Sequence, residues 1–426
     1  MQKILLFLFI INVLAVFAQV TPSPSPAQKT PILLLNATLH VGNGKVLEGV
    51  DIRLEKGKIA KIGKGLALIG EGTAIDLVGK HLYPGFIALN SNIGLEEIEA
   101  VRATSDSREV GGNNPNARAI VGYNTDSKVI PTLRSNGVLM AQIAPSGNGF
   151  SGTSSIVQLD AWNYEDAVMV TDDGVYLEWF QMNFSSTPTK EQAEEQQKNK
   201  EKAEANLHQK MQEAMAYRLA QESGKPFTHN LMLSALVPVL KKEKKLFIRA
   251  ITEKQIIAAV AFARQYDLNM VIVGGQDAYL QTDLLKRNNV PVILYKPHQL
   301  PMNEDDAVDL PYRMPKILYD AGVVFGYTID AFWNVRNLPF MAGTAAAYGL
   351  EKEEALKALT LYPAMILGID KRVGTIEEGK DATLIVSEGD VLDMRTSKVI
   401  YAFIEGRKVN LTDLHKELYE KFQGKY

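Results

Sequence analysis

The feature that most constrains the fold is a regular alternation of short apolar segments with helix-forming segments in the second half of the chain. The apolar segments have the length and composition of buried strands, and they cover residues 246–250, 270–275, 290–295 and 323–327. Helical patterns follow at 256–263, 309–321, 335–348 and 351–359. Strands that alternate with helices indicate a parallel sheet covered by helices. The number of repeats suits a (β/α)₈ barrel better than a small open sheet.

Both ends of the chain have a different, strand-rich pattern. Residues 50–62 alternate apolar and polar positions on either side of Lys56-Gly57, which predicts a β-hairpin with glycine in the turn. Residues 381–386 and 398–409 are also strand-like. The two ends therefore have the material to build one small β-domain together.

The first residues have the pattern of an export signal. Lys3 precedes an apolar run, and residues 16–18 (VFA) place small side chains before a cleavage point. We expect a signal peptide at 1–18, a Pro/Ser-rich tether at 19–31 that packs in no core, and a mature protein that is periplasmic or extracellular. A membrane anchor is the alternative, but the run is shorter than the ~20 residues that cross a bilayer, so no stable membrane insertion is expected.

Composition excludes several classes of protein. The chain of 426 residues has no cysteine, which rules out disulfides, thiolate-bound zinc and cysteine nucleophiles. Its net charge of −3 argues against a dedicated nucleic-acid binder, which usually carries a basic surplus. Residues 188–223 are highly charged and helix-forming, and we interpret them as a solvated helical excursion or as an arm that binds a partner.

Three sequence blocks resemble the amidohydrolase superfamily, particularly its imidazolonepropionase-like members. They are residues 82–87 (LYPGFI), 355–364 (ALKALTLYPA) and 374–384 (GTIEEGKDATL), in the family's order. The resemblance implies an α/β fold in which a (β/α)₈ TIM-type barrel at 84–370, with the excursion at 188–223, stands beside a small β-sandwich built from 32–83 and 371–410. Residues 411–426 would form a C-terminal tail.

The resemblance also implies metal-assisted hydrolysis of amide bonds, in which histidines and a carboxylate hold one or two divalent ions. Asn90 and Asn92 stand where the family has its first His-x-His pair. Arg249 and Gly274-Gly275 stand where later histidines are expected at strand ends. An amide oxygen is a weak zinc ligand and arginine brings a fixed positive charge, so we predict no metal cofactor, although zinc is the family norm.

Asp330 is the family site residue that the sequence retains, and by resemblance it would relay a proton in catalysis. Arg249 and Arg336 are candidate substrate-binding residues, although Arg336 has a helix-surface role as its alternative. Arg249 is also a candidate ion-pair partner of Asp330 across the barrel mouth. His298 is the histidine expected on the functional face, where we interpret it as a loop residue.

Two further segments are candidates with open alternatives. Five acidic residues would bind a hard cation through oxygen ligands or else belong to a polar loop; they are Glu96, Glu97, Glu99, Asp106 and Glu109. The Gly/Ser-rich residues 145–155 would form a loop that cradles an anionic group, or a flexible loop.

Two functions remain. The first is an exported hydrolase of non-peptide carbon–nitrogen bonds with a degenerate metal site, in which Asp330 is the acid/base. The second is a catalytically inactive homologue that binds a ligand or a partner. Expected partners are a small amide-like molecule and either a second copy of the chain or a paralogous amidohydrolase.

Overall fold

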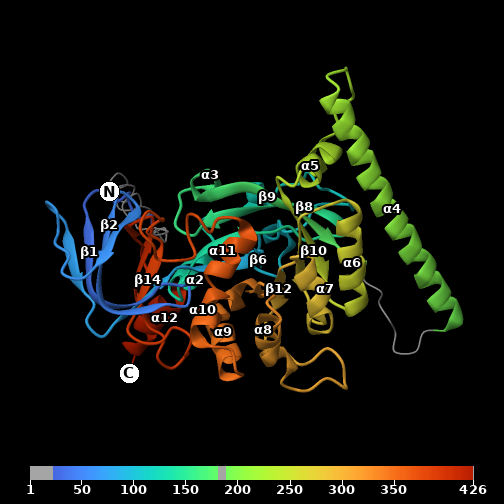
Figure 1. Cartoon of the computed structure of the whole chain (residues 1–426). Coiled ribbons are helices and arrows are strands. Elements are labelled where there is room, and N and C mark those ends of the chain that lie inside the picture. Colours follow the sequence, from blue (N-terminus) through green and yellow to red (C-terminus); the bar gives the residue numbers. More distant parts are fainter. Residues whose placement is uncertain (1–22, 181–188, 426) are drawn as a thin grey trace, which may run out of the picture.

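The computed structural model describes residues 23–180 and 189–425, which form a mixed α/β structure with two eight-stranded sheets (Figure 1). One sheet forms the barrel, and the other contains strands from both chain ends. The predicted signal peptide lies outside the described residues. Within the described part of the chain, no helix has the length and apolar character needed to cross a membrane.

The barrel sheet follows chain order from β6 to β13, and β6 and β13 lie in contact, so the barrel is nearly closed. Its strands are β6 (Phe86–Ser91), β7 (Val138–Ile143), β8 (Gly149–Gln158), β9 (Val168–Glu178), β10 (Lys245–Ala250), β11 (Met270–Gly274), β12 (Val292–Tyr295) and β13 (Phe325–Thr328). The four predicted strands between 246 and 327 are confirmed as β10 to β13. The interior-facing side chains of the barrel strands pack as a separate core inside the barrel. In this core the ring centres of Tyr176 (β9) and Phe247 (β10) lie 4.9 Å apart, and the rings are stacked.

Helices cover the outside of the barrel. They are α2 (Val129–Arg134), α6 (Glu253–Gln265), α7 (Thr282–Arg287), α8 (Leu310–Asp320), α9 (Leu338–Ala347), α10 (Lys352–Lys357) and α11 (Leu361–Leu367). Of these, α2, α6, α7 and α8 connect parallel strands, and α9 to α11 follow the last barrel strand. Short helical segments occur at η1 (Arg102–Thr104), η2 (Ala119–Gly122), α3 (Tyr164–Ala167), η3 (Ala278–Gln281) and η4 (Phe332–Asn337). A capping box begins α6, because the side chains of Thr252 and Gln255 each bond to the other's backbone.

The barrel departs from a strict (β/α)₈ pattern at β8. This strand runs antiparallel to both β7 and β9. A parallel connection needs a crossover of a dozen or more residues, whereas only residues 144–148 separate β7 from β8. The expectation of a loop at 145–155 is therefore wrong from residue 149 onward. Small residues fit this strand because a side chain at Gly152 (φ +135°) would lie 2.6 Å from the Ala117 carbonyl oxygen.

The second sheet has the order β16-β15-β14-β5-β1-β2-β3, and β4 pairs with β1. Its strands are β1 (Ile32–His40), β2 (Val46–Glu55), β3 (Lys58–Gly63), β4 (Thr73–Asp76), β5 (His81–Pro84), β14 (Leu384–Ser387), β15 (Val399–Ile404) and β16 (Arg407–Lys408). The pairing of β14 with β5 joins the two chain ends, and apolar side chains from both ends form one core. The predicted hairpin is confirmed as β2–β3, with positive φ at both Lys56 and Gly57.

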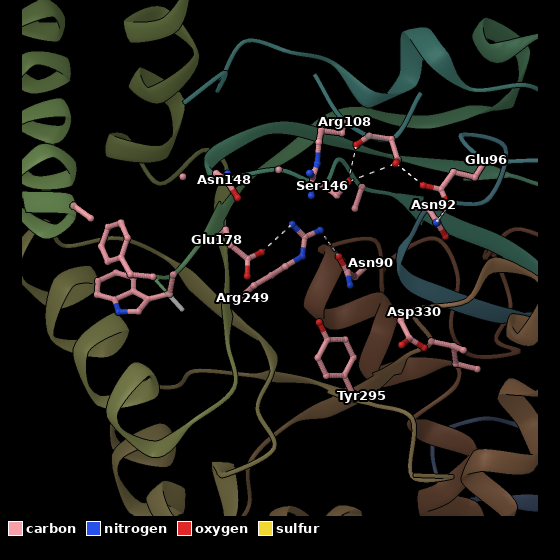
Figure 2. Close-up of a pocket in the computed structure, with 18 of the residues that line it drawn as sticks. Asn90, Asn92, Glu96, Arg108, Ser146, Asn148, Glu178, Arg249, Tyr295 and Asp330 are labelled. Atoms are coloured by element: carbon pink, nitrogen blue, oxygen red, sulfur yellow. Dashed lines mark hydrogen bonds and ion pairs between the residues drawn. The ribbon is translucent and has the colours of Figure 1, made fainter. Parts of the chain in front are cut away.

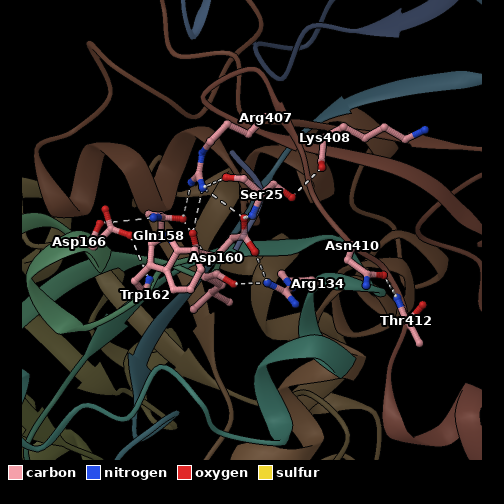
Figure 3. Close-up of polar contacts among 11 residues, drawn as sticks. Ser25, Arg134, Gln158, Asp160, Trp162, Asp166, Arg407, Lys408, Asn410 and Thr412 are labelled. Atoms are coloured by element: carbon pink, nitrogen blue, oxygen red, sulfur yellow. Dashed lines mark hydrogen bonds and ion pairs between the residues drawn. The ribbon is translucent and has the colours of Figure 1, made fainter. Parts of the chain in front are cut away.

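A buried charge cluster ties this second sheet to the barrel (Figure 3). Asp160, which follows β8, accepts hydrogen bonds from Arg134 at the end of α2 (2.5 Å) and from Arg407 in β16 (3.2 Å). The Ser25 backbone N–H also donates to Asp160 at 3.0 Å, and the Gln28 side chain bonds to the backbone of Leu54 and Gly57. The described part of the predicted tether, residues 23–31, is thus docked on the protein through its polar groups.

The charged excursion forms α4 (Lys190–Glu222), a 33-residue helix that stands at one side of the barrel with α5 (Leu231–Leu240) (Figure 1). It is not fully solvated. Leu207 and Met211 are buried, and His208 bonds to the Tyr266 hydroxyl at the end of α6. The C-terminal tail forms α12 (Leu414–Gln423), which leaves its apolar side chains exposed.

Candidate functional site

A cavity of about 840 Å³ opens at the carboxyl ends of the parallel barrel strands (Figure 2). The cavity contains Asn90 and Asn92 from the end of β6, Arg249 from the end of β10 and Asp330 from the loop after β13. The three strand ends that carry these residues lie far apart in the sequence. They meet here because parallel strands end at the same rim of the barrel, which is the functional face of this architecture.

Arg249 is the central side chain of the cavity. Its Nη2 donates to the Asn90 side-chain oxygen at 2.9 Å and to the Pro145 carbonyl at 2.8 Å. Its Nη1 lies 3.8 Å from the Glu178 carboxylate, and its guanidinium lies 4.7 Å from the centre of the Tyr176 ring. The side chain is 11% exposed. Neutral oxygens, one carboxylate and an aromatic face therefore hold a fixed cation at the mouth of the barrel.

The residues at this place do not fit a zinc centre. Zinc takes thiolate, imidazole or carboxylate ligands, whereas the side chains here are two amides and a guanidinium. The Asn90 side-chain oxygen already accepts from Arg249, and its amide nitrogen donates to Thr328 at 3.2 Å. Across residues 23–180 and 189–425, no group of three or more His, Asp or Glu side chains is arranged to hold a metal ion.

The backbone at the end of β11 has a conformation that favours glycine. Gly274 and Gly275 have φ of +102° and +53°, which side chains rarely adopt. A Cβ on Gly275 would lie 2.6 Å from the Val292 side chain. A histidine at this strand end would therefore require the local backbone to change, in addition to the substitution itself.

Asp330 lies at the edge of the cavity and pairs with a residue that the sequence did not single out. Its carboxylate binds the Lys296 ammonium at 2.6 Å, and the Asp330 side chain is 63% exposed. The suggested ion pair with Arg249 is wrong, because Arg249 is engaged by Asn90, Pro145 and Glu178. Lys296 follows β12 directly and so reaches the same rim.

Of the five acidic residues predicted near the site, Glu96 lines the cavity. It accepts hydrogen bonds from Asn92 Nδ2 and from the Ser107 hydroxyl, both at 2.5 Å. Glu97 instead accepts from the Lys128 backbone at 3.3 Å. The cluster is therefore dispersed among loop contacts, which supports the polar-loop interpretation.

The remaining predicted residues lie elsewhere or contribute in part. Ser146, Gly147 and Asn148, in the loop that precedes β8, do line the cavity. Arg336 lies in η4 and His298 bonds to the Thr344 hydroxyl at 2.6 Å, and neither residue lines the cavity.

Several cavity residues were missed at the sequence level. Tyr295 ends β12 and points into the cavity, and burial raises the pKa of its phenol despite the opposing effect of Arg249. Its place at the end of a predicted strand was a usable signal. Arg108 and the α4 residues Asn199 and Lys200 also line the cavity, but nothing local in the sequence indicates that these segments fold over the barrel mouth.

A hydrogen-bonded network extends below Arg249 into the barrel. Tyr176 donates to the Gln142 side-chain oxygen at 2.9 Å, and Gln142 donates to Asp173 at 2.8 Å. Burial raises the pKa of Asp173 from 3.8 to about 6, while the hydrogen bonds from Ser154 and Gln142 oppose this rise. The network fixes the Tyr176 ring on which the Arg249 guanidinium rests.

The fold and the rim cavity define an α/β-barrel protein with its candidate site at the carboxyl ends of the parallel strands. The sequence profile of the Amidohydrolase family matches residues 174–410, more than half of the chain, and the chain belongs to this family of hydrolases. The predicted resemblance is thereby confirmed.

Individual proteins agree with this assignment. The amidohydrolase tasK of Hapsidospora irregularis is 21% identical over 380 residues, which are 82% of this chain and 39% of that protein. An imidazolonepropionase of Thermoplasma volcanium is 34% identical over 87 residues, 20% of this chain and 22% of that protein. The chain thus aligns with well under half of the length of either curated relative.

Solved structures extend the comparison to the whole fold. An amidohydrolase from Thermotoga maritima superposes with a TM-score of 0.78 at 27% identity, over 89% of this chain and 99% of that one. A Xaa-Pro dipeptidase with bound methionine has a TM-score of 0.56 at 14% identity, over 89% and 99% of the two chains. The second likeness is one of fold alone.

Proposed function

We propose that the chain is an exported member of the amidohydrolase family that binds a small amide-like molecule at the barrel mouth and does not act as a metal-dependent hydrolase. The position of Arg249 carries this proposal. Its guanidinium is fixed by Asn90 and Pro145 where the family resemblance places a metal ligand. A fixed positive charge there opposes a divalent ion by like-charge repulsion.

The size and position of the cavity support a ligand-binding role. Its volume of about 840 Å³ lies within the range of small-molecule sites, roughly 300–1,000 Å³. It opens on the functional face of the barrel, where loops carry specificity. The ligand would lie between the strand-end residues and the loop residues Ser146 and Asn148.

An assay for hydrolysis tests the proposal directly. The purified protein is incubated with N-acetylated amino acids and dipeptides, with and without added zinc or manganese, and product amines are measured. We expect no turnover under either condition. Turnover that depends on added metal and disappears with a chelator would contradict the proposal.

A metal-independent hydrolase is the second candidate, and the position of Asp330 at the cavity edge favours it. A carboxylate there has access to a bound ligand and is able to relay a proton, a role worth roughly 10²–10⁴-fold in rate. If turnover is found without metal, Asp330→Asn should reduce it by that factor and leave the melting temperature nearly unchanged, because the Asp330 carboxylate is largely exposed. Full activity in this variant would remove Asp330 from the mechanism.

We also propose that residues 32–83 and 371–410 form the family's composite β-sandwich beside the barrel at 84–370. The shared sheet and its own apolar core, drawn from both segments, support this division. A homodimer or a complex with a paralogous amidohydrolase stays a proposal as well.

A further inference from the structure

The acidic groups of the cavity are already engaged. Glu96 accepts from Asn92 and Ser107 at 2.5 Å each. Asp330 is bound to Lys296 at 2.6 Å, and Glu178 lies beside Arg249. Each of these carboxylates therefore already lies next to a hydrogen-bond donor or a cation of the protein.

The donors of the cavity are, by contrast, incompletely used. Arg249 Nη1 is buried and has no hydrogen-bond acceptor, because the nearest carboxylate, that of Glu178, is 3.8 Å away. Among the described residues, the guanidinium of Arg108 and the hydroxyl of Tyr295 form no hydrogen bond with another side chain or with the backbone. All three groups line the cavity, and in Figure 2 they point into it.

This imbalance has an energetic consequence. A buried N–H of a guanidinium without an acceptor has lost its hydration and gained no hydrogen bond in return, which is unfavourable. The Glu178 carboxylate offsets part of the Arg249 charge from 3.8 Å, but it is too far away to accept a hydrogen bond from Nη1. The other contacts of Arg249 are neutral, since Asn90 and Pro145 offer uncharged oxygens and the Tyr176 ring covers one face. A ligand with a negatively charged acceptor would satisfy Nη1 and would also pair with the Arg108 guanidinium.

We propose that the cavity binds the carboxylate of a small organic acid, with Arg249 and Arg108 as the two cationic donors and the Tyr295 hydroxyl as a third donor. The planar guanidinium matches the two oxygens of a carboxylate in a way that an ammonium group does not. The inference rests on the proposed ligand-binding function and specifies the class of its ligand, an amide-like molecule that carries a carboxylate. Arg249 would then occupy the position of a metal-binding histidine and would also bind the carboxylate of the small molecule.

A matched pair of probes tests this inference on the full mature protein. N-acetylglycine and N-acetylglycinamide have nearly the same size and differ in the negative charge of the carboxylate. Isothermal titration calorimetry measures their affinities at neutral pH. We expect N-acetylglycine to bind at least roughly tenfold more tightly than the amide.

Variants locate the difference in the cavity. Arg108 is an exposed side chain, so Arg108→Gln should fold normally and should lower the preference for N-acetylglycine about tenfold. Arg395→Gln is the matched control, because Arg395 is 84% exposed and pairs with Asp393 in a loop outside the cavity. This control should keep the full preference. Arg249→Lys keeps the charge and loses the planar fork, and it should weaken N-acetylglycine binding more than it weakens binding of the amide.

The outcomes separate this inference from the function on which it rests. Equal binding of the two probes would overturn the carboxylate assignment and leave a ligand-binding cavity. An unchanged preference in Arg108→Gln, or equal binding of inorganic phosphate, would also overturn it. Binding of neither probe at ~10 mM would overturn the inference and count against the ligand-binding function. Metal-dependent turnover would refute the proposed function, while a charge-dependent affinity would still support the carboxylate site.

Discussion

Replacing Asp160 by asparagine should destabilise the protein strongly, although this residue is remote from the cavity. The Asp160 side chain is 3% exposed and lies between Arg134 and Arg407, which are 7% and 11% exposed. The substitution keeps the shape and removes the negative charge, so both guanidinium groups remain buried without their counter-charge. Burial already lowers the pKa of Arg134, and the Asp160 charge opposes this effect.

The magnitude follows from the burial of the cluster. Removing one partner from a buried ion pair costs about 3–5 kcal/mol. With an unfolding entropy of about 2.1 cal/mol/K per residue, a chain of this length has about 0.9 kcal/mol/K in total, so the expected fall in melting temperature is about 3–6 °C. Because buried pairs are poorly screened, the shift should persist in ~1 M salt.

Differential scanning calorimetry of the mature protein measures this shift. Asp320→Asn is the matched control, since it removes an exposed carboxylate that pairs with Lys316 within α8. Its expected effect is under about 1 °C, in line with the small contribution of surface ion pairs. An Asp160→Asn shift no larger than that of the control would refute the view that this charge joins the two sheets.

Two further predictions concern titration and export. Burial raises the pKa of Asp173 from 3.8 to about 6, so the folded state binds a proton at this carboxyl group more tightly than the unfolded state does. The protonated group therefore stabilises the fold at low pH, and this contribution is lost as pH rises through about 4 to 6. Asp173→Asn should therefore show a smaller fall in melting temperature from pH 4 to pH 7, and identical profiles for the two proteins would contradict this. The mature protein should begin near Gln19 and be found outside the cytoplasm; N-terminal sequencing that finds Met1 on exported material would exclude the predicted cleavage.

Local sequence signals predicted the parts of the fold that depend on neighbouring residues. The turn at Lys56-Gly57 formed as expected, because a hairpin turn is determined within a few residues. The strands of the second barrel half were recognised by their apolar runs. The first part of β8 was predicted as a loop, because its small and polar residues have no strand-like pattern and are buried by contacts with distant segments.

The sequence predicted which residues lie at the rim of the barrel, but it did not predict which residues they bond to. The rim positions of Asn90, Arg249 and Asp330 follow from the order of strands and from the family resemblance. Their partners do not, because Arg249 bonds to Pro145 and Asp330 bonds to Lys296 through loop geometry that no local pattern encodes. The contribution of α4 to the cavity depends on how a long helix packs across α5 and α6.

The metal content of the purified protein tests the central claim most directly. The protein is expressed with zinc in the medium, purified without a chelator or a metal-affinity tag, and analysed by elemental mass spectrometry. With Asn90 and Asn92 at the positions of the first ligand pair and Arg249 fixed beside them, we predict far less than one zinc ion per chain. One or more zinc ions per chain that survive gel filtration would contradict the claim that a guanidinium has taken the place of the metal site.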